Sequence, residues 1–189
     1  MRLFTAINLS DRSRQLLLDK VNILKNNIEQ DLKWVDPENW HVTLKFLGDT
    51  KKEKAEKVKE DITQIASFNK SFPVILNKVG AFPHLNHPKV LYVGVNEGFA
   101  ELTQIQEKLE NKLYERGYSR ENRRYTPHLT LARSRKNTNF NILSDKLKNF
   151  AEKNNFIKIY FKADRISLMK SELTSQGPIY EEVFAKNLQ

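Results

Sequence analysis

The chain has 189 residues, of which 39% are hydrophobic and 29% charged, so it is long and apolar enough to fold around a core. It contains no cysteine, which excludes disulfide bonds, thiolate metal sites and a cysteine nucleophile. The formal net charge of +9 favours a polyanionic partner such as nucleic acid, although a lysine-rich surface can also serve solubility alone. Residues 1–8 do not read as a signal peptide, and no apolar run reaches the roughly 18 residues of a membrane span, so we expect a cytoplasmic protein.

Hydrophobic periodicity predicts strands and helices in a duplicated order. In chain order we expect a strand over residues 2–9, a helix over 10–30, a strand over 42–48, a helix over 51–67, strands over 72–82 and 89–95 around a loop, a helix over 98–116, a strand over 128–133, a helix over 141–153, and strands over 155–162, 164–170 and 179–186. No low-complexity linker separates the two halves. We therefore predict an α+β fold class in which residues 1–189 form a single domain of two intertwined lobes. Two antiparallel sheets would face a central cleft, with helices outside and pseudo-twofold symmetry.

Two short segments, one in each half, are nearly identical. They read His41-Val42-Thr43-Leu44 and His128-Leu129-Thr130-Leu131. Successive side chains of a strand point to opposite faces, so His41 and Thr43 share one face while Phe46 is expected on the opposite, core face. The same parity places His128 beside Thr130. If these faces oppose each other, two imidazoles and two hydroxyls converge on one cleft.

These residue types suit acid–base chemistry on a phosphodiester. One group must remove a proton from the attacking oxygen, and another must protonate the departing oxygen. Histidine, with an unperturbed pKa of about 6.5, can do either near neutral pH. Threonine hydroxyls can donate hydrogen bonds to the non-bridging phosphate oxygens. A single His-x-Thr would indicate no more than a half-buried histidine, but its repetition in both halves favours a functional pair.

The sequence around both segments resembles the 2H phosphoesterase superfamily. Within it, the chain is similar to the RNA 2′,3′-cyclic phosphodiesterases, historically called 2′-5′ RNA ligases. The resemblance runs in order through essentially the whole chain. The stretches that carry it are residues 2–7 (RLFTAI), 34–48 (WVDPENWHVTLKFLG), 88–95 (PKVLYVGV), 127–133 (PHLTLAR), 171–173 (SEL) and 177–180 (GPIY).

This resemblance implies a bilobal fold with the cyclic phosphate held between the two motifs. It implies that His41 is the proton donor, that His128 is the proton acceptor that activates water, and that Thr43 and Thr130 hold phosphate oxygens. The implied product is a 2′-phosphomonoester, and no metal or organic cofactor is implied. The near-symmetric motifs themselves do not show which histidine is the acid.

Four further residues are candidates for substrate binding. Arg133 ends the second motif, where simple alternation points it away from His128, so it is either a surface charge or a phosphate contact. Phe4 either stacks on a base or packs in the core. Arg124 and Tyr125 lie just before the second motif, while position 126, where several relatives carry a basic residue, is threonine.

Other functions remain open at this point. The same site could act as a 2′,5′-phosphodiesterase or a reversible 2′-5′ RNA ligase, and a non-enzymatic RNA-binding module would hold a phosphate without turnover. The expected partners are RNA with 2′,3′-cyclic phosphate ends or cyclic-phosphate nucleotides, with no membrane, and we expect a monomer. His84 and His87 have a spacing that could suggest a metal pair, but they lie in a proline-flanked loop without accompanying carboxylates, which favours plain solvent exposure.

Overall fold

The structure is a computed structural model that describes residues 1–28, 32–153, 158–175 and 177–189. In chain order the elements are β1 (Arg2–Asn8), α1 (Asp11–Asn27), β2 (Leu32–Trp34), the 3-10 turn η1 (Pro37–Asn39), β3 (His41–Asp49), α2 (Lys52–Ser67), β4 (Phe72–His84), β5 (His87–Glu97), α3 (Phe99–Glu115), β6 (His128–Ser134), α4 (Phe140–Lys153), β7 (Lys158–Ala163), β8 (Arg165–Leu173) and β9 (Pro178–Asn187). Every strand and helix predicted from periodicity is present.

Some predicted boundaries were wrong or lie outside the described residues. The short strand β2 and the turn η1 were not predicted, because three-residue elements carry no periodic signal. The loop expected between β4 and β5 is instead a tight hairpin, in which His84 pairs with His87. Residues 29–30 of the predicted first helix and residues 155–157 of a predicted strand lie outside the described residues.

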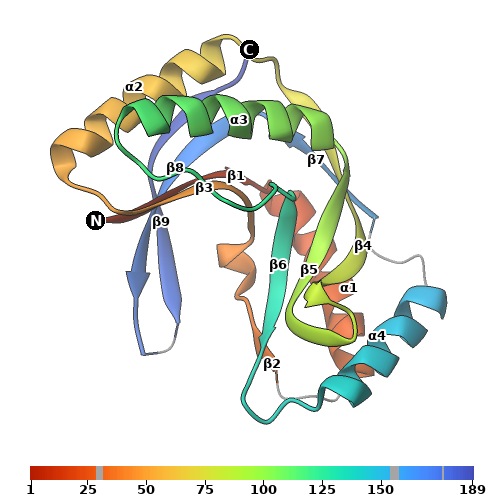
Figure 1. Cartoon of the computed structure of the whole chain (residues 1–189). Helices are drawn as coiled ribbons and strands as arrows, with labels where there is room; N and C mark the ends of the chain where they lie inside the picture. Colours follow the sequence, from red (N-terminus) through yellow and green to blue (C-terminus); the bar gives the residue numbers. More distant parts are fainter. Residues whose placement is uncertain (29–31, 154–157, 176) are drawn as a thin grey trace.

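The strands form one curled, nine-stranded sheet within the described residues (Figure 1). Its order is β7-β4-β5-β6-β3-β1-β8-β9, with β2 paired to β6, and the pairs are antiparallel. The sheet divides into two lobes, β3-β1-β8-β9 and β6-β5-β4-β7, joined where Val42 pairs with Leu129. The α+β class and the two-lobed arrangement are therefore confirmed, and the two predicted sheets meet edge to edge as one.

The helices cover the outside of the curled sheet (Figure 1). Helices α2 and α3 pack together over the first lobe, against β3, β8 and β9, whereas α1 and α4 pack on β4, β5 and β7 of the second lobe. Each helix buries an apolar stripe, as in α3, where Leu102, Ile105, Leu109 and Leu113 are all inaccessible to solvent. Among the described residues, no helix combines the length and apolar character needed to cross a bilayer.

Each of the two motif strands contains a bulge just after its threonine. In β3, Thr43 pairs with Ala6 but Lys45 pairs with Thr5, so Leu44 is an extra residue. In β6, Thr130 pairs with Tyr92 but Ala132 pairs with Leu91, so Leu131 is the corresponding extra residue. A bulge reverses the alternation of side chains beyond it.

The bulges correct two predictions from simple alternation. Phe46 was expected in the core, but its side chain is 63% exposed and its ring lies 5.9 Å from that of Phe4, on the face that carries His41. Arg133 was expected to point away from His128. Because the bulge places both Leu131 and Ala132 on the buried face, Arg133 instead returns to the face that carries His128. At this point of β3 the buried side chain is that of Lys45, which is 2% exposed.

Candidate active site

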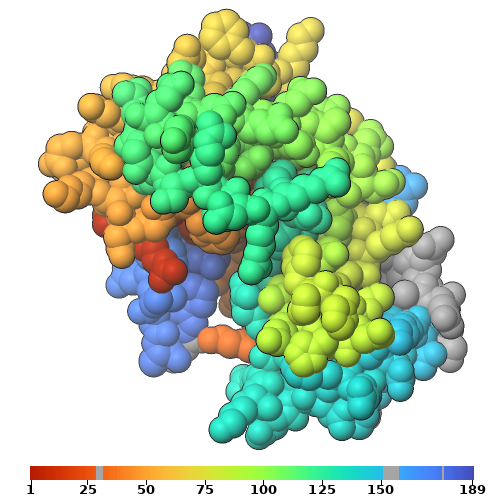
Figure 2. All heavy atoms as spheres, viewed as in Figure 1, coloured from red at the N-terminus to blue at the C-terminus, as the bar shows by residue number. Residues whose placement is uncertain are grey.

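The two motifs face each other across the β3–β6 junction. Because the strands are antiparallel and Val42 pairs with Leu129, His41 lies opposite Thr130 and Thr43 lies opposite His128. All four side chains are half-buried. Figure 2 shows a hollow on this side of the molecule, between the β8–β9 hairpin and the lobe that contains β5 and β6. The register of β3 and β6 thus brings the four predicted residues side by side, close enough for His128 to act electrostatically on His41.

His41 is held at both ring nitrogens. Its Nδ1 lies 2.8 Å from the carbonyl oxygen of Asn39, which can only accept, so Nδ1 carries the proton. Its Nε2 lies 3.0 Å from Oγ1 of Thr43, whose hydroxyl donates to the neutral ring. Burial lowers the pKa of His41 to about 4; the Asn39 carbonyl opposes the shift, and the charge of His128 adds to it. The free site therefore holds a neutral His41 near pH 7.

His128 is held in the same way at Nδ1, which donates to the carbonyl oxygen of Thr126 over 2.7 Å. Nε2 is thereby the basic nitrogen of the neutral ring. Burial lowers the pKa of His128, the Thr126 carbonyl opposes this shift, and the positive charge of Arg133 adds to it. Arg133 therefore favours the neutral, proton-accepting form of His128.

An aromatic pair supports each imidazole. His41 lies 4.8 Å from the ring of Phe4 and 5.3 Å from that of Tyr180, which themselves are 5.0 Å apart. His128 lies 4.9 Å from Phe82 and 5.3 Å from Tyr92, whose rings stack at 4.3 Å. Each histidine is thus packed against one phenylalanine and one tyrosine from other strands of its own lobe, which limits its ring to a small range of orientations.

The candidate substrate-binding residues take different places. Phe4 is only 2% exposed and lies beneath His41, so it packs in the core of the site and offers no open face to a base. The Tyr125 hydroxyl donates to the carbonyl oxygen of Thr43 over 2.9 Å, which ties the loop before β6 to β3. Burial raises the pKa of Tyr125, so this donor stays protonated. Arg124 is exposed on the same loop.

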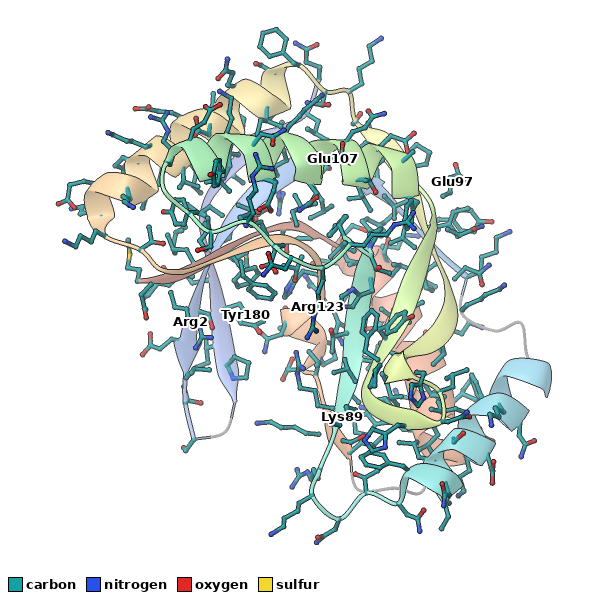
Figure 3. All side chains as sticks on the ribbon, in the orientation of Figure 1. Arg2, Lys89, Glu97, Glu107, Arg123 and Tyr180 are labelled. Carbon is teal, nitrogen blue, oxygen red and sulfur yellow. The ribbon has the colours of Figure 1, made fainter. Side chains whose placement is uncertain are left out.

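Cationic side chains surround the hollow. Figure 3 shows Arg2 and Tyr180 at the β8–β9 side, Arg123 on the loop before β6, and Lys89 on the opposite lobe. Arg133 and Arg2 both act electrostatically on the Tyr180 hydroxyl, although burial raises the pKa of that group overall. Cations on both sides of the hollow suit a substrate that carries more than one phosphate.

Several residues of the site were missed by the sequence analysis. Asn39 and Tyr180 were quoted only as part of the resemblance, since their contacts with His41 depend on tertiary structure. Lys45 was missed because a lysine in a strand gives no sign of burial. Its Nζ lies 2.9 Å from the Glu110 carboxylate and donates to the carbonyl oxygen of Ser119 over 2.8 Å.

This ion pair fixes the loop that leads into the second motif. Glu110 also accepts a hydrogen bond from the backbone N–H of Glu121 over 2.9 Å. The loop is therefore attached to β3 at Lys45 and, through Tyr125, at Thr43. Both attachments lie next to the bulge of β3, so the second motif is positioned relative to the first.

The described part of the chain shows no cluster of side chains that could ligate a metal ion. No group of three or more histidine, cysteine or carboxylate side chains gathers within the part of the chain that is described. The rings of His84 and His87 are 6.4 Å apart, and His87 packs on Phe140 at 4.1 Å. These two histidines lie at the turn of the β4–β5 hairpin, outside the motif pair.

Comparison with known families assigns the chain by sequence. Residues 28–174 match the model of the 2′-5′ RNA ligase superfamily. The chain belongs to this superfamily. A relative from Aeropyrum pernix, named an RNA 2′,3′-cyclic phosphodiesterase, is 33% identical over 81% of this chain and 84% of its own length. Another of the same name, from Archaeoglobus fulgidus, is 32% identical over 97% of this chain and 98% of its own length.

Solved structures of similar proteins share the fold. A protein from Thermus thermophilus superposes with a TM-score of 0.79 at 22% identity, covering 100% of this chain and 98% of that one. Escherichia coli LigT, solved in complex with 3′-AMP, gives a TM-score of 0.76 at 21% identity, covering 99% of this chain and 97% of that one. The curled two-lobed sheet is thus the common architecture of these proteins.

Proposed function

We propose that this protein hydrolyses the 2′,3′-cyclic phosphodiester at RNA ends to a 2′-phosphomonoester, with His41 and His128 as the acid–base pair. The observation that carries the proposal is the register of β3 and β6, which sets each histidine opposite the threonine of the other motif. The names of the relatives from Aeropyrum pernix and Archaeoglobus fulgidus support the same reaction.

In the proposed reaction a water molecule attacks phosphorus while the bond between phosphorus and the 3′ oxygen breaks. His128 Nε2 takes the proton of the water, and His41 Nε2 gives a proton to the departing 3′ oxygen. Thr43 and Thr130 donate hydrogen bonds to the non-bridging oxygens, which stabilises the charge that shifts onto them in the transition state. Proton exchange with solvent then restores the starting protonation states.

The role of His41 as the acid depends on the substrate. In the free protein burial lowers the pKa of His41 to about 4, so the ring is neutral at pH 7. A bound phosphate anion brings negative charge close to the ring and raises its pKa. The ring then takes up the proton that it later gives to the departing 3′ oxygen. We therefore expect the protonation of His41 to accompany substrate binding.

The proposed RNA chain extends from the phosphate over the cations around the hollow. Arg133 lies on the His128 face and suits a phosphate oxygen, while exposed Arg124 and Arg123 suit the more distant backbone. Phe46, exposed on the His41 side, offers an aromatic face for the terminal base in place of Phe4. The expectations of a monomer and of a cytoplasmic location stay predictions.

The direct test is a product analysis. The protein is incubated, with a chelator present, with a short RNA that ends in a 2′,3′-cyclic phosphate, and the end group is identified by mass and by enzymatic sensitivity. A 2′-phosphate supports the proposal, and an unchanged cyclic end refutes it. Parallel reactions with a 2′,5′-linked dinucleotide and with a 5′-hydroxyl acceptor RNA show whether the site instead cleaves or joins 2′,5′ bonds. Tight, salt-sensitive binding without any product would indicate an RNA-binding module.

A further inference from the structure

The β8–β9 hairpin forms the wall of the site on the His41 side (Figures 1 and 2). Near the turn of this hairpin, Tyr180 pairs with Ser171 and its ring lies 5.3 Å from that of His41, nearly perpendicular to it. Toward its tip the side chains of Leu173 and Ile179 are 69% and 60% exposed, so little packing holds this end. This end of the hairpin therefore covers His41 through Tyr180, and its position must be fixed by specific contacts with the rest of the protein.

Asn39 makes such a contact. Its side-chain Nδ2 donates to the carbonyl oxygen of Pro178, the first residue of β9, over 2.9 Å. The carbonyl oxygen of the same residue accepts the Nδ1 proton of His41 over 2.8 Å. One residue thus touches both the imidazole and the strand whose Tyr180 packs on that imidazole.

The backbone of Asn39 is itself rigid. It ends the 3-10 turn η1, where its N–H donates to the carbonyl oxygen of Asp36 over 2.9 Å. The Asp36 side chain caps the turn by accepting from the N–H of Glu38 over 2.9 Å. Pro37 fixes the backbone at the start of the turn. The carboxamide therefore holds the hairpin from a fixed point.

The second motif lacks a counterpart to this arrangement. Thr126 occupies the position two residues before His128 and supplies the equivalent carbonyl oxygen. Its side chain is exposed, so the backbone contact is repeated but the side-chain contact to another strand is not. The side-chain bridge is thus a feature of the His41 half.

We propose that Asn39 is a positioning residue that couples the β8–β9 hairpin to His41, its carbonyl orienting the imidazole and its carboxamide holding the strand that covers it. The inference rests on the proposed function in so far as His41 takes part in catalysis. It assigns to the hairpin a role in keeping water away from one of the two histidines.

The enclosure of His41 provides a readout that a purely structural role would not change. The titratable groups that face His41 in the described residues are His128 on β6 and Tyr180 on β9, and Arg2 and Arg133 act on Tyr180. Burial is the largest cause of the lowered His41 pKa. If the hairpin is released, water reaches the ring and the pKa rises toward about 6.5.

The test compares Asn39→Ala with Asn27→Ala in the full chain. Asn27 also donates from Nδ2 to a backbone carbonyl, that of Ile23 over 2.8 Å, but at the exposed end of α1. We expect Asn39→Ala to raise the His41 pKa by about one unit in NMR titration, to speed hydrogen exchange of the amides of residues 179–182 about tenfold, and to lower kcat about tenfold with a smaller change in KM. Asn27→Ala should leave all of these unchanged. A His41 pKa and a hairpin exchange rate equal to those of the unmodified protein would overturn the inference.

A second pair of variants keeps the inference testable if Asn39→Ala folds poorly. Tyr180→Leu removes the aromatic cover without touching Asn39, and it should raise the His41 pKa as well; combined with Asn39→Ala, the two shifts should be less than additive. Asn39→Asp keeps the shape of the side chain but has no donor for the Pro178 carbonyl, and faster hairpin exchange is expected. Unchanged exchange in Asn39→Asp would also overturn the inference. Full activity of His41→Ala would refute the proposed function instead, while the titration and exchange results would still decide the role of Asn39.

Discussion

The two halves of the site share a backbone frame but differ in the side chains that surround it. In both, a carbonyl two residues before the histidine accepts from Nδ1, a phenylalanine and a tyrosine pack on the ring, and a bulge follows the threonine. At the position five residues after the histidine, however, the first half carries Phe46 and the second carries Arg133. The repeated backbone thus supplies two similar proton-transfer groups. Phe46 makes the surroundings of His41 more apolar, and Arg133 makes those of His128 cationic.

The largest expected effect comes from removing either imidazole. His41→Ala and His128→Ala should each lower kcat on RNA with a cyclic phosphate end by about 1,000-fold, since each variant lacks the group that carries out one of the two proton transfers. Rates are measured by quantifying the 2′-phosphate product. His84→Ala, at the distant β4–β5 turn, is the matched control and should retain full activity. If only one of the two histidine variants lost activity, the two histidines would not act as a pair.

The second effect concerns the buried ion pair of the first half. The second half has Ala132 where the first has Lys45, whose side chain is 1% exposed. Lys45→Met leaves Glu110 buried without its cation, so the free energy of unfolding should fall by about 3–5 kcal/mol in urea denaturation. The double variant Lys45→Met with Glu110→Leu removes both charges and should recover much of this loss. A single variant as stable as the unmodified protein would show that the pair does not hold the loop.

The third effect is a pH dependence of stability that belongs to His41. Its pKa is about 4 in the folded protein and about 6.5 when unfolded, so below pH 6.5 the unfolded chain binds a proton that the folded one does not. The His41 contribution to the free energy of unfolding is complete above pH 6.5 and falls, by on the order of 3 kcal/mol, as the pH drops to about 4. Denaturation of the unmodified protein and of His41→Gln between pH 4 and 7.5 measures the difference. Equal slopes for the two proteins would contradict the burial of His41.

The smallest effect contrasts Arg133 with Phe46. Arg133→Met should lower kcat/KM about tenfold, weaken its salt dependence and raise the pKa of His128, because a charged hydrogen bond and a nearby positive charge are lost. Phe46→Ala should also lower kcat/KM about tenfold through lost stacking but leave the salt dependence unchanged. The two variants serve as controls for each other. Identical salt dependence of kcat/KM in both variants would show that Arg133 and Phe46 do not bind different parts of the substrate, the phosphate and the base.

The elements and the motif pair could be predicted because their signals are local. Amphipathic stripes such as Leu102, Ile105, Leu109 and Leu113 in α3 are visible in any sequence, and the two His-x-Thr segments stand out through repetition. The α+β class followed from the order of these elements. The cleft followed from strand parity, which holds up to Thr43 and Thr130.

Beyond those threonines prediction failed for a physical reason. A bulge is set by pairing with a neighbouring strand, and nothing in the run Thr43-Leu44-Lys45-Phe46 marks Leu44 as the extra residue. Parity therefore placed Phe46 and Arg133 on the wrong face. Long-range contacts such as Asn39 with Pro178, and Lys45 with Glu110, were equally invisible, because each joins residues far apart in the chain.

The strand order also has a consequence for how the protein is made. Strand β1 lies between β3 and β8, and Asn8 contacts Met169, 161 residues later in the chain. During synthesis the first-lobe sheet therefore stays incomplete, with one edge of β1 unpaired, until β8 and β9 have left the ribosome. Folding dominated by such distant pairings is slow. The nascent chain should therefore gain the proposed activity on cyclic phosphate ends only late in synthesis, and an unfinished polypeptide would expose an unpaired β1 edge to chaperones in the meantime.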